Sequence, residues 1–289
     1  MIFGTTFSHR YARYLNLNLT DSLDEILKLK FNIIRLCAYW DEIQSTPNEF
    51  NFFDIKAILD KCQQNNQDVI FTLGMKSPRW PEFYFPSWLK IKNPTYAINH
   101  VLPFIKQSII KLKNYNCIKY WQIENEPLDP SGHDKMVIPF DALKQEVDLA
   151  RNLDPERKII INLWGNELTK RNILPYVRLL ADVIGLDIYY RVPCAIFKYR
   201  GPKDNDQTLS NIINESTKPI WITELQAEPW GNNMNMDSQL LLNYFRRAVK
   251  LNSQAILFWG IEYLLSEKNK GNYSLWNEVL NILHTKNFS

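Results

Sequence analysis

The chain alternates short apolar runs with longer stretches in which apolar residues return every three or four positions. Continuous apolar runs such as Ile159-Ile160-Ile161 are typical of strands that are buried on both faces of a parallel sheet. The pattern predicts eight strands, over Ile2–Phe7, Asn32–Cys37, Asp68–Leu73, Tyr120–Asn125, Lys158–Leu163, Val183–Tyr189, Pro219–Thr223 and Ala255–Trp259.

The segments between these strands have the spacing of amphipathic helices. Apolar side chains recur at i, i+3, i+4 and i+7, for example at Ile55, Ile58, Leu59 and Cys62. Ser22–Glu25 has the sequence of a capping box, and Asp237 precedes a later apolar stripe in the position of an N-cap. We therefore expect helices to connect successive strands.

Eight strand–helix units in 289 residues suit a (β/α)8 barrel, which usually has about 250 residues plus loops. A doubly wound open sheet would give the same alternation, but it usually carries a glycine-rich phosphate turn after an early strand. The chain has only nine glycines and no G-x-G-x-x-G motif, and it shows no linker or low-complexity tract. The sequence predicts an α/β fold, a (β/α)8 TIM barrel that forms a single domain over residues 1–289.

Composition and charge exclude several classes of protein. Hydrophobic residues make up 45% of the chain, and 9 glycines and 15 prolines are too few for a collagen-like or low-complexity sequence. The net charge is +3 and no dense Lys/Arg block occurs, so we expect neither a nucleic-acid partner nor a membrane surface as partner. No apolar run approaches the roughly 18 residues of a membrane span.

The N-terminal segment Met1–Phe7 has a strand pattern and lacks the charged and apolar regions of a signal peptide. No C-x-x-C pair occurs, which indicates free thiols in a reducing compartment at Cys37, Cys62, Cys117 and Cys194. We expect a cytoplasmic monomer, or a secreted protein if a signal has been removed.

Two predicted strands continue into acidic residues. The fourth runs into Asn125-Glu126-Pro127 and the seventh into Thr223-Glu224. Functional side chains of a barrel lie at the C-terminal ends of its strands, and strands four and seven face each other, so we expect the two carboxylates to converge. Cleavage of a glycosidic bond needs such a pair, since one group protonates the leaving oxygen while the other attacks or activates water. Neighbouring carboxylates also separate their pKa values.

These strand ends resemble those of the clan A glycoside hydrolases, the retaining (β/α)8 enzymes of the cellulase, β-mannanase and β-galactosidase kind. The resemblance covers nearly the whole chain and is closest in look to the cellulase-like family 5 group, without assigning one family. It implies that Glu126 is the acid/base, that Glu224 is the nucleophile, and that Asn125 binds the sugar 2-hydroxyl.

Three further strand ends agree with the clan pattern. The resemblance implies that Arg35 holds the nucleophile ionised and that Tyr189 hydrogen-bonds to it, whereas Tyr190 would point to the opposite face of the strand. Trp259 is similar to the tryptophan that lies under the sugar at the cleavage point. One position departs from the pattern, because Asp187 stands where many clan A families have a histidine.

The sequence lacks the residues that other barrel chemistries require. The four histidines show no metal-binding spacing, so we expect no metal ion and no cofactor. A Schiff-base lyase or aldolase needs a lysine at a strand end, and no predicted strand ends in one. The leading hypothesis is a retaining glycoside hydrolase or transglycosidase that acts on a β-linked carbohydrate. The alternative is a carbohydrate-binding barrel that has lost its activity, although both carboxylates are present together with Arg35, Asn125 and Tyr189.

Overall fold

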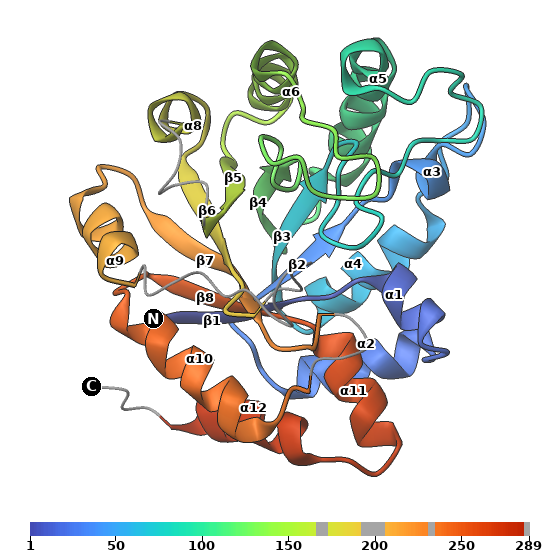
Figure 1. The fold of residues 1–289 in the computed structure, drawn as a ribbon. Coiled ribbons are helices and arrows are strands. Elements are labelled where there is room, and N and C mark those ends of the chain that lie inside the picture. The colour runs from blue at the N-terminus through green and yellow to red at the C-terminus, as the bar shows by residue number, and fades with distance from the viewer. Residues whose placement is uncertain (166–172, 192–205, 231–234, 286–289) are drawn as a thin grey trace. The chain divides into compact units, whose positions relative to one another are not determined.

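The computed structural model describes residues 1–165, 173–191, 206–230 and 235–285 (Figure 1). Its strands follow one another from β1 to β8 in the order of a closed parallel barrel. All eight predicted strands are present, as β1 Ile2–Thr6, β2 Ile33–Cys37, β3 Asp68–Leu73, β4 Ile118–Ile123, β5 Lys158–Trp164, β6 Val183–Ile188, β7 Ile220–Gln226 and β8 Ala255–Trp259. The prediction of a (β/α)8 barrel is confirmed, since a doubly wound sheet would show a reversal in strand order.

Helices connect the strands as the apolar spacing predicts (Figure 1). Those before β5 are α1 His9–Tyr14, α2 Leu19–Lys28, α3 Trp40–Ile43, α4 Phe53–Gln64, α5 Pro94–Leu112 and α6 Phe140–Leu153. Those after β5 are α8 Leu174–Leu180, α9 Asp206–Glu215, α10 Ser238–Lys250, α11 Ile261–Asn269 and α12 Ser274–His284. No helix in the described residues is both long and apolar enough to cross a membrane.

The two predicted helix starts have different outcomes. Asp237 caps α10, and its carboxylate accepts the backbone N–H of Leu240 at 2.8 Å. The capping-box prediction at Ser22 is wrong, because α2 begins earlier and Asn18 is its N-cap, accepting the N–H of Asp21 at 3.1 Å. Asparagine caps a helix as well as serine does, so Asn18 serves as the N-cap and the helix begins directly after it.

The described residues form two compact units. Unit 1 comprises Met1–Ile34, residues 164–165 and the described residues from Gly185 onward, and unit 2 comprises Arg35–Leu163 and Ile173–Ile184. The organisation of the whole chain as a single domain stays a prediction.

In unit 1, strand β8 pairs in parallel with β1 and with β7, and α10 packs beside α12 (Figure 1). The pairing of β7 with β8 shifts register: between Ile222 and Leu225, β7 advances three residues while β8 advances two. The extra residue makes a β-bulge at Thr223–Glu224. A bulge bends its strand and changes the direction of the side chains on it.

In unit 2, strand β4 pairs in parallel with β3 and with β5, and α5 packs beside α6 (Figure 1). Strand β4 ends at Ile123, two residues before the predicted end at Asn125. The reason is the backbone of Glu124 and Glu126, whose φ angles are +61° and +42°. A strand requires negative φ, so the chain leaves the sheet here.

Candidate functional site

Glu224 lies in unit 1 at the bulge of β7, with 2% of its side chain exposed. The Tyr189 hydroxyl donates a hydrogen bond to Glu224 Oε2, and the hydroxyl of Thr223 donates to Asp187 Oδ1 at 2.6 Å. Asp187 and Tyr189 are two residues apart and therefore share one side of the chain, whereas consecutive strand residues normally point to opposite faces. The bulge is what allows Thr223 and Glu224, which are consecutive, to meet both of them.

Two tryptophans enclose the ring of Tyr189. The indole of Trp259 packs on it at 5.4 Å with an interplanar angle of 76°, and that of Trp230 at 4.7 Å with 72°. Both indoles are half-buried, so each holds the phenol in place and still offers an apolar surface on which a sugar ring can stack. From the sequence, Trp230 is one of several tryptophans near loops or strand ends where a ring could stack on a sugar, and only Trp259 was predicted to belong to the site.

Tyr190 belongs to a different cluster. Its ring packs against Tyr244 at 4.9 Å, and the Arg247 guanidinium lies 3.9 Å from the ring centroid. Burial raises the pKa of the Tyr190 hydroxyl well above its usual range. The structure thus places Tyr189, and not Tyr190, against Glu224.

Asn125 and Glu126 lie in unit 2, directly beyond the end of β4, and both are buried. Asn162 on β5 holds them: its Oδ1 accepts the N–H of Glu126 at 2.9 Å, and its Nδ2 donates to Asn125 Oδ1 at 2.8 Å. Gln122 Nε2 donates to the same Asn162 oxygen at 3.0 Å, and Gln122 Oε1 accepts from Arg35 Nη1 at 3.4 Å. Arg35 is fully buried. Its contact with Glu224 stays a prediction.

Sequence reasoning missed Asn162. It could have been noticed as a polar residue inside an apolar strand, as Arg35 was. Asn162 holds the backbone of Glu126, whose positive φ costs about 1–3 kcal/mol in a non-glycine residue and needs surrounding contacts to maintain it. Strain of this kind concentrates at functional sites.

A second buried carboxyl belongs to Glu124, two residues before Glu126. The Glu124 carboxylate is fully buried and accepts the N–H of Met75 at 2.8 Å and the N–H of Lys76 at 2.6 Å. Burial raises the pKa of Glu124 to about 7, although these amides act in the opposite direction. Burial and the neighbouring Glu124 also raise the pKa of Glu146, on α6, well above its usual range. This pair can therefore keep a proton near neutral pH.

Metal ligation has no support among the described residues, where no group of three or more His, Cys, Asp or Glu side chains is placed to hold an ion. Cys37, Cys62 and Cys117 are buried free thiols, and Cys194 lies outside the described residues.

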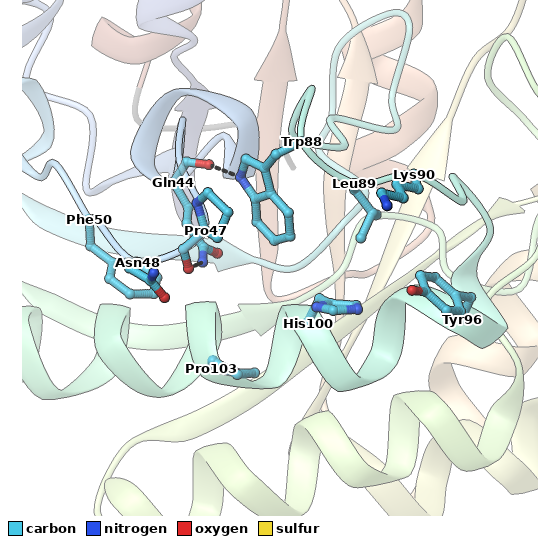
Figure 2. Close-up of a pocket in the computed structure, with 10 residues that line it drawn as sticks. All are labelled: Gln44, Pro47, Asn48, Phe50, Trp88, Leu89, Lys90, Tyr96, His100 and Pro103. Atoms are coloured by element: carbon cyan, nitrogen blue, oxygen red, sulfur yellow. Dashed lines mark hydrogen bonds between the residues drawn. The ribbon is translucent and has the colours of Figure 1, made fainter.

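Unit 2 also contains a cavity of about 660 Å³ between α5 and the loops that follow β2 and β3 (Figure 2). None of the predicted site residues lines it. The lining residues are Gln44, Pro47, Asn48, Phe50, Trp88, Leu89, Lys90, Tyr96, His100 and Pro103. The indole N–H of Trp88 donates to the Gln44 carbonyl at 2.8 Å, which fixes the ring across this cavity (Figure 2).

Solved structures with a similar fold include glycosidases of several families. A GH5_18 protein from Streptomyces cattleya, in complex with GlcNAc, superimposes with a TM-score of 0.72 and 12% identity over 99% of this chain and 81% of that one. An intracellular xylanase from Thermoanaerobacterium saccharolyticum, in complex with xylotetraose, gives 0.62 and 17% over 90% and 86%. An exo-β-1,4-mannosidase from an Opitutaceae bacterium gives 0.71 and 13% over 99% and 60%. At these identities the likeness shows the fold.

No curated protein matches the chain significantly. The family profile "Glycosyl hydrolase family 10" matches residues 2–280, nearly the whole chain, and confirms the resemblance to clan A. Because the match spans both glutamate-bearing strand ends, this chain belongs to glycosyl hydrolase family 10, a family of glycosidases whose substrates are carbohydrates.

Proposed function

We propose that this protein is a retaining β-glycosidase, a hydrolase or transglycosidase, in which Glu224 is the nucleophile and Glu126 the acid/base. One observation carries the proposal: the buried Glu224 carboxylate accepts the Tyr189 hydroxyl. A hydrogen bond donated to the ionised form of a carboxyl favours that form, and a nucleophile must be ionised. The closed parallel barrel supports the pairing with Glu126, because the C-terminal ends of its strands share one face.

The reaction would proceed in two displacements. Glu224 attacks the anomeric carbon, the bond to the leaving oxygen breaks, and Glu126 gives its proton to that oxygen. Glu126, now ionised, takes a proton from water or from a sugar hydroxyl. The oxygen of that acceptor attacks the anomeric carbon and releases Glu224. Neither a cofactor nor a metal ion takes part in the proposed reaction. The protein acts as a monomer in this proposal.

The remaining predicted residues have binding roles in the proposal. Asn125, held by Asn162, binds the 2-hydroxyl of the sugar at the cleavage point. Trp259 lies under that sugar, with its indole in edge-to-face contact with the Tyr189 ring. Arg35 helps to keep Glu224 ionised, since an arginine near a carboxylate lowers its pKa. The substrate is β-linked, and aryl β-xylosides and β-mannosides are the first to test because similar structures include a xylanase and a β-mannosidase.

The test of the two roles uses Glu126→Ala and aryl glycosides of graded leaving-group acidity. Loss of the proton donor should lower the rate about 10²–10⁴-fold for poor leaving groups and little for dinitrophenol. The glycosyl-enzyme should then accumulate, and azide should release it as the β-glycosyl azide. If the wild type turns over a substrate but this variant responds neither to leaving-group acidity nor to azide, Glu126 is not the acid/base.

Two further measurements separate the alternatives. Retention requires about 5–5.5 Å between the two carboxyl groups, whereas inversion requires roughly 6.5–9.5 Å, so a crystal structure of the protein with an inhibitor tests it. Proton NMR of the first product should show the β-anomer. A wild-type protein that binds oligosaccharides but cleaves no β-glycoside would support the inactive carbohydrate-binding barrel.

A further inference from the structure

A fully buried lysine lies beside Glu126. Lys76 follows the end of β3 and has 0% of its side chain exposed. Its ammonium donates to the carbonyl oxygens of Glu126 at 2.9 Å and Asp129 at 3.1 Å and to Ser131 Oγ at 2.7 Å. A buried ammonium is costly unless it is hydrogen-bonded and paired. These bonds therefore tie the loop that carries Glu126 to the loop after β3.

Glu82 supplies the opposite charge. Its Oε2 lies 3.1 Å from Lys76 Nζ and accepts the hydroxyl of Ser131 at 2.8 Å. The two loops are also joined through their backbones, since the N–H of His133 donates to the carbonyl of Pro81 at 3.2 Å. The charge of Lys76 is thus balanced at a fixed position, within two hydrogen-bond lengths of the Glu126 carboxyl.

Ser131 connects the two carboxyls. Its oxygen accepts from Lys76, so its single proton is available for Glu82 at 2.8 Å or for Glu126 Oε2 at 3.4 Å. While Glu126 carries the proton that it will give to the leaving group, the hydroxyl bonds to Glu82. Once Glu126 is ionised, the same hydroxyl can turn and donate to it.

We propose that the Lys76–Glu82 pair sets the pH at which Glu126 loses its proton, and that Ser131 stabilises Glu126 in its ionised form during the second step. The inference rests on the proposed role of Glu126. Alone, Lys76 would favour the ionised form and Glu82 would disfavour it, each through a short path of buried atoms. Together they nearly cancel, so Glu126 keeps the proton that the first step needs.

Other charged groups of unit 2 also face this region. Glu124 is turned toward the N–H groups of Met75 and Lys76, Arg79 is buried in the same loop as Glu82, and Asp129 and His133 lie on the loop after β4. They stay unchanged in the variants below, so differences between those variants report on Lys76, Glu82 and Ser131.

The test is the pH profile of kcat/KM for a substrate with a poor leaving group. Glu82→Gln removes the carboxylate that is paired with the ammonium and should move the basic limb to lower pH by about one unit. Lys76→Met should move it to higher pH by a similar amount. The double variant replaces a buried ion pair by neutral groups, which proteins often tolerate, and should return the limb to its wild-type position. The exposed pair Lys144–Asp148 is the control: Asp148→Asn and Lys144→Met should each leave the limb unchanged.

Ser131→Ala tests the second part. It should slow hydrolysis of the glycosyl-enzyme about 3–10-fold, less than the loss of a short hydrogen bond to a charged group because Ser131 Oγ lies 3.4 Å from Glu126 Oε2, and leave its formation from a dinitrophenyl glycoside unchanged. Ser131→Thr should restore the rate. Pre-steady-state bursts separate these two steps.

The outcomes distinguish this proposal from the role of Glu126 itself. If azide rescues Glu126→Ala but Glu82→Gln leaves the basic limb in place, if the double variant shifts the limb, or if both single variants move it the same way, the tuning proposal is overturned and Glu126 keeps its role. If azide fails to rescue Glu126→Ala, the proposed role of Glu126 is wrong, and any shift in these variants reports on another group.

Discussion

The two candidate catalytic glutamates are held by different kinds of structure. Glu224 lies inside a strand, at a bulge, and its carboxylate accepts a phenol whose ring is enclosed by Trp230 and Trp259. Glu126 lies beyond the end of its strand, at φ +42°, and is held by Asn162 on β5 and by residues of two loops. The proposed roles explain the contrast. A nucleophile keeps one charge state until it reacts, whereas an acid/base changes its protonation twice in each cycle.

The positions of the two glutamates are also fixed by different interactions. The position of Glu224 follows from strand pairing, which backbone hydrogen bonds fix over several residues. The position of Glu126 follows from a few side chains, above all Asn162 and Lys76, which bind its backbone N–H and C=O. Changes to loop residues should therefore alter the pH dependence of Glu126, and changes around Tyr189 should alter that of Glu224. The predictions below test this difference.

The largest effect is expected for Glu224→Gln. The amide keeps the shape but cannot form a glycosyl-enzyme, so kcat should fall on the order of 10⁴-fold or more for every leaving group. Glu126→Gln, the matched change at the other carboxyl, should retain fast formation of the intermediate with dinitrophenyl glycosides. Equal losses in both variants with that substrate would contradict the division of roles.

Gly74→Ala should destabilise the protein by about 3 kcal/mol, because it combines backbone strain with overpacking. Gly74 has φ +138°, and a Cβ there would lie 2.2 Å from Glu124 Cδ. Urea unfolding measures the loss. Gly4→Ala in unit 1, where a Cβ would lie 2.6 Å from the Ile33 carbonyl oxygen, is the control. Both should be less stable, but only Gly74→Ala should also move the basic limb of kcat/KM.

Tyr189→Phe should lower kcat/KM about 10–100-fold, since it removes a hydrogen bond to a charged group worth about 1.5–3 kcal/mol. The hydroxyl donates to the Glu224 carboxylate and favours its charged form, so its removal should move the acid limb of the profile to higher pH. Tyr190→Phe is the control and should leave the profile unchanged. An unmoved acid limb in Tyr189→Phe would show that the phenol does not set the charge of Glu224.

The smallest effect is expected for the buried carboxyl pair Glu124 and Glu146. The raised pKa of Glu146 means that the unfolded chain releases this proton near pH 4.5 while the folded chain keeps it, so stability falls as the pH rises above that value. Glu146→Gln removes this loss and should stabilise the protein at pH 7, with little gain at pH 4.5. Denaturation at both pH values tests it, with the exposed Glu156→Gln as control. A gain of the same size at both pH values would contradict the proposed titration.

The sequence predicted the structure correctly where burial alone determines the pattern of residues. The eight strands could be found because a strand covered on both faces must be continuously apolar, and Arg35 and Glu224 were visible as charged residues within or next to such runs. Exact boundaries were less accessible. The strand ahead of Glu126 ends at Ile123 because of two positive φ angles, and Asn18 is the N-cap of α2 in place of Ser22 because two residues compete for one cap.

The sequence by itself determined the order of strands and helices and the candidate residues at the strand ends, since hydrophobic periodicity and the polarity of strand ends are local properties of the chain. Only the tertiary structure decided which side chains meet. The bulge that turns both Thr223 and Glu224 toward Asp187 and Tyr189 depends on the pairing of β7 with β8. The burial of Lys76 between Glu82, Ser131 and Glu126 depends on two loops that are 50 residues apart in sequence. Such contacts arise from packing and charge compensation between distant segments, which no local pattern records.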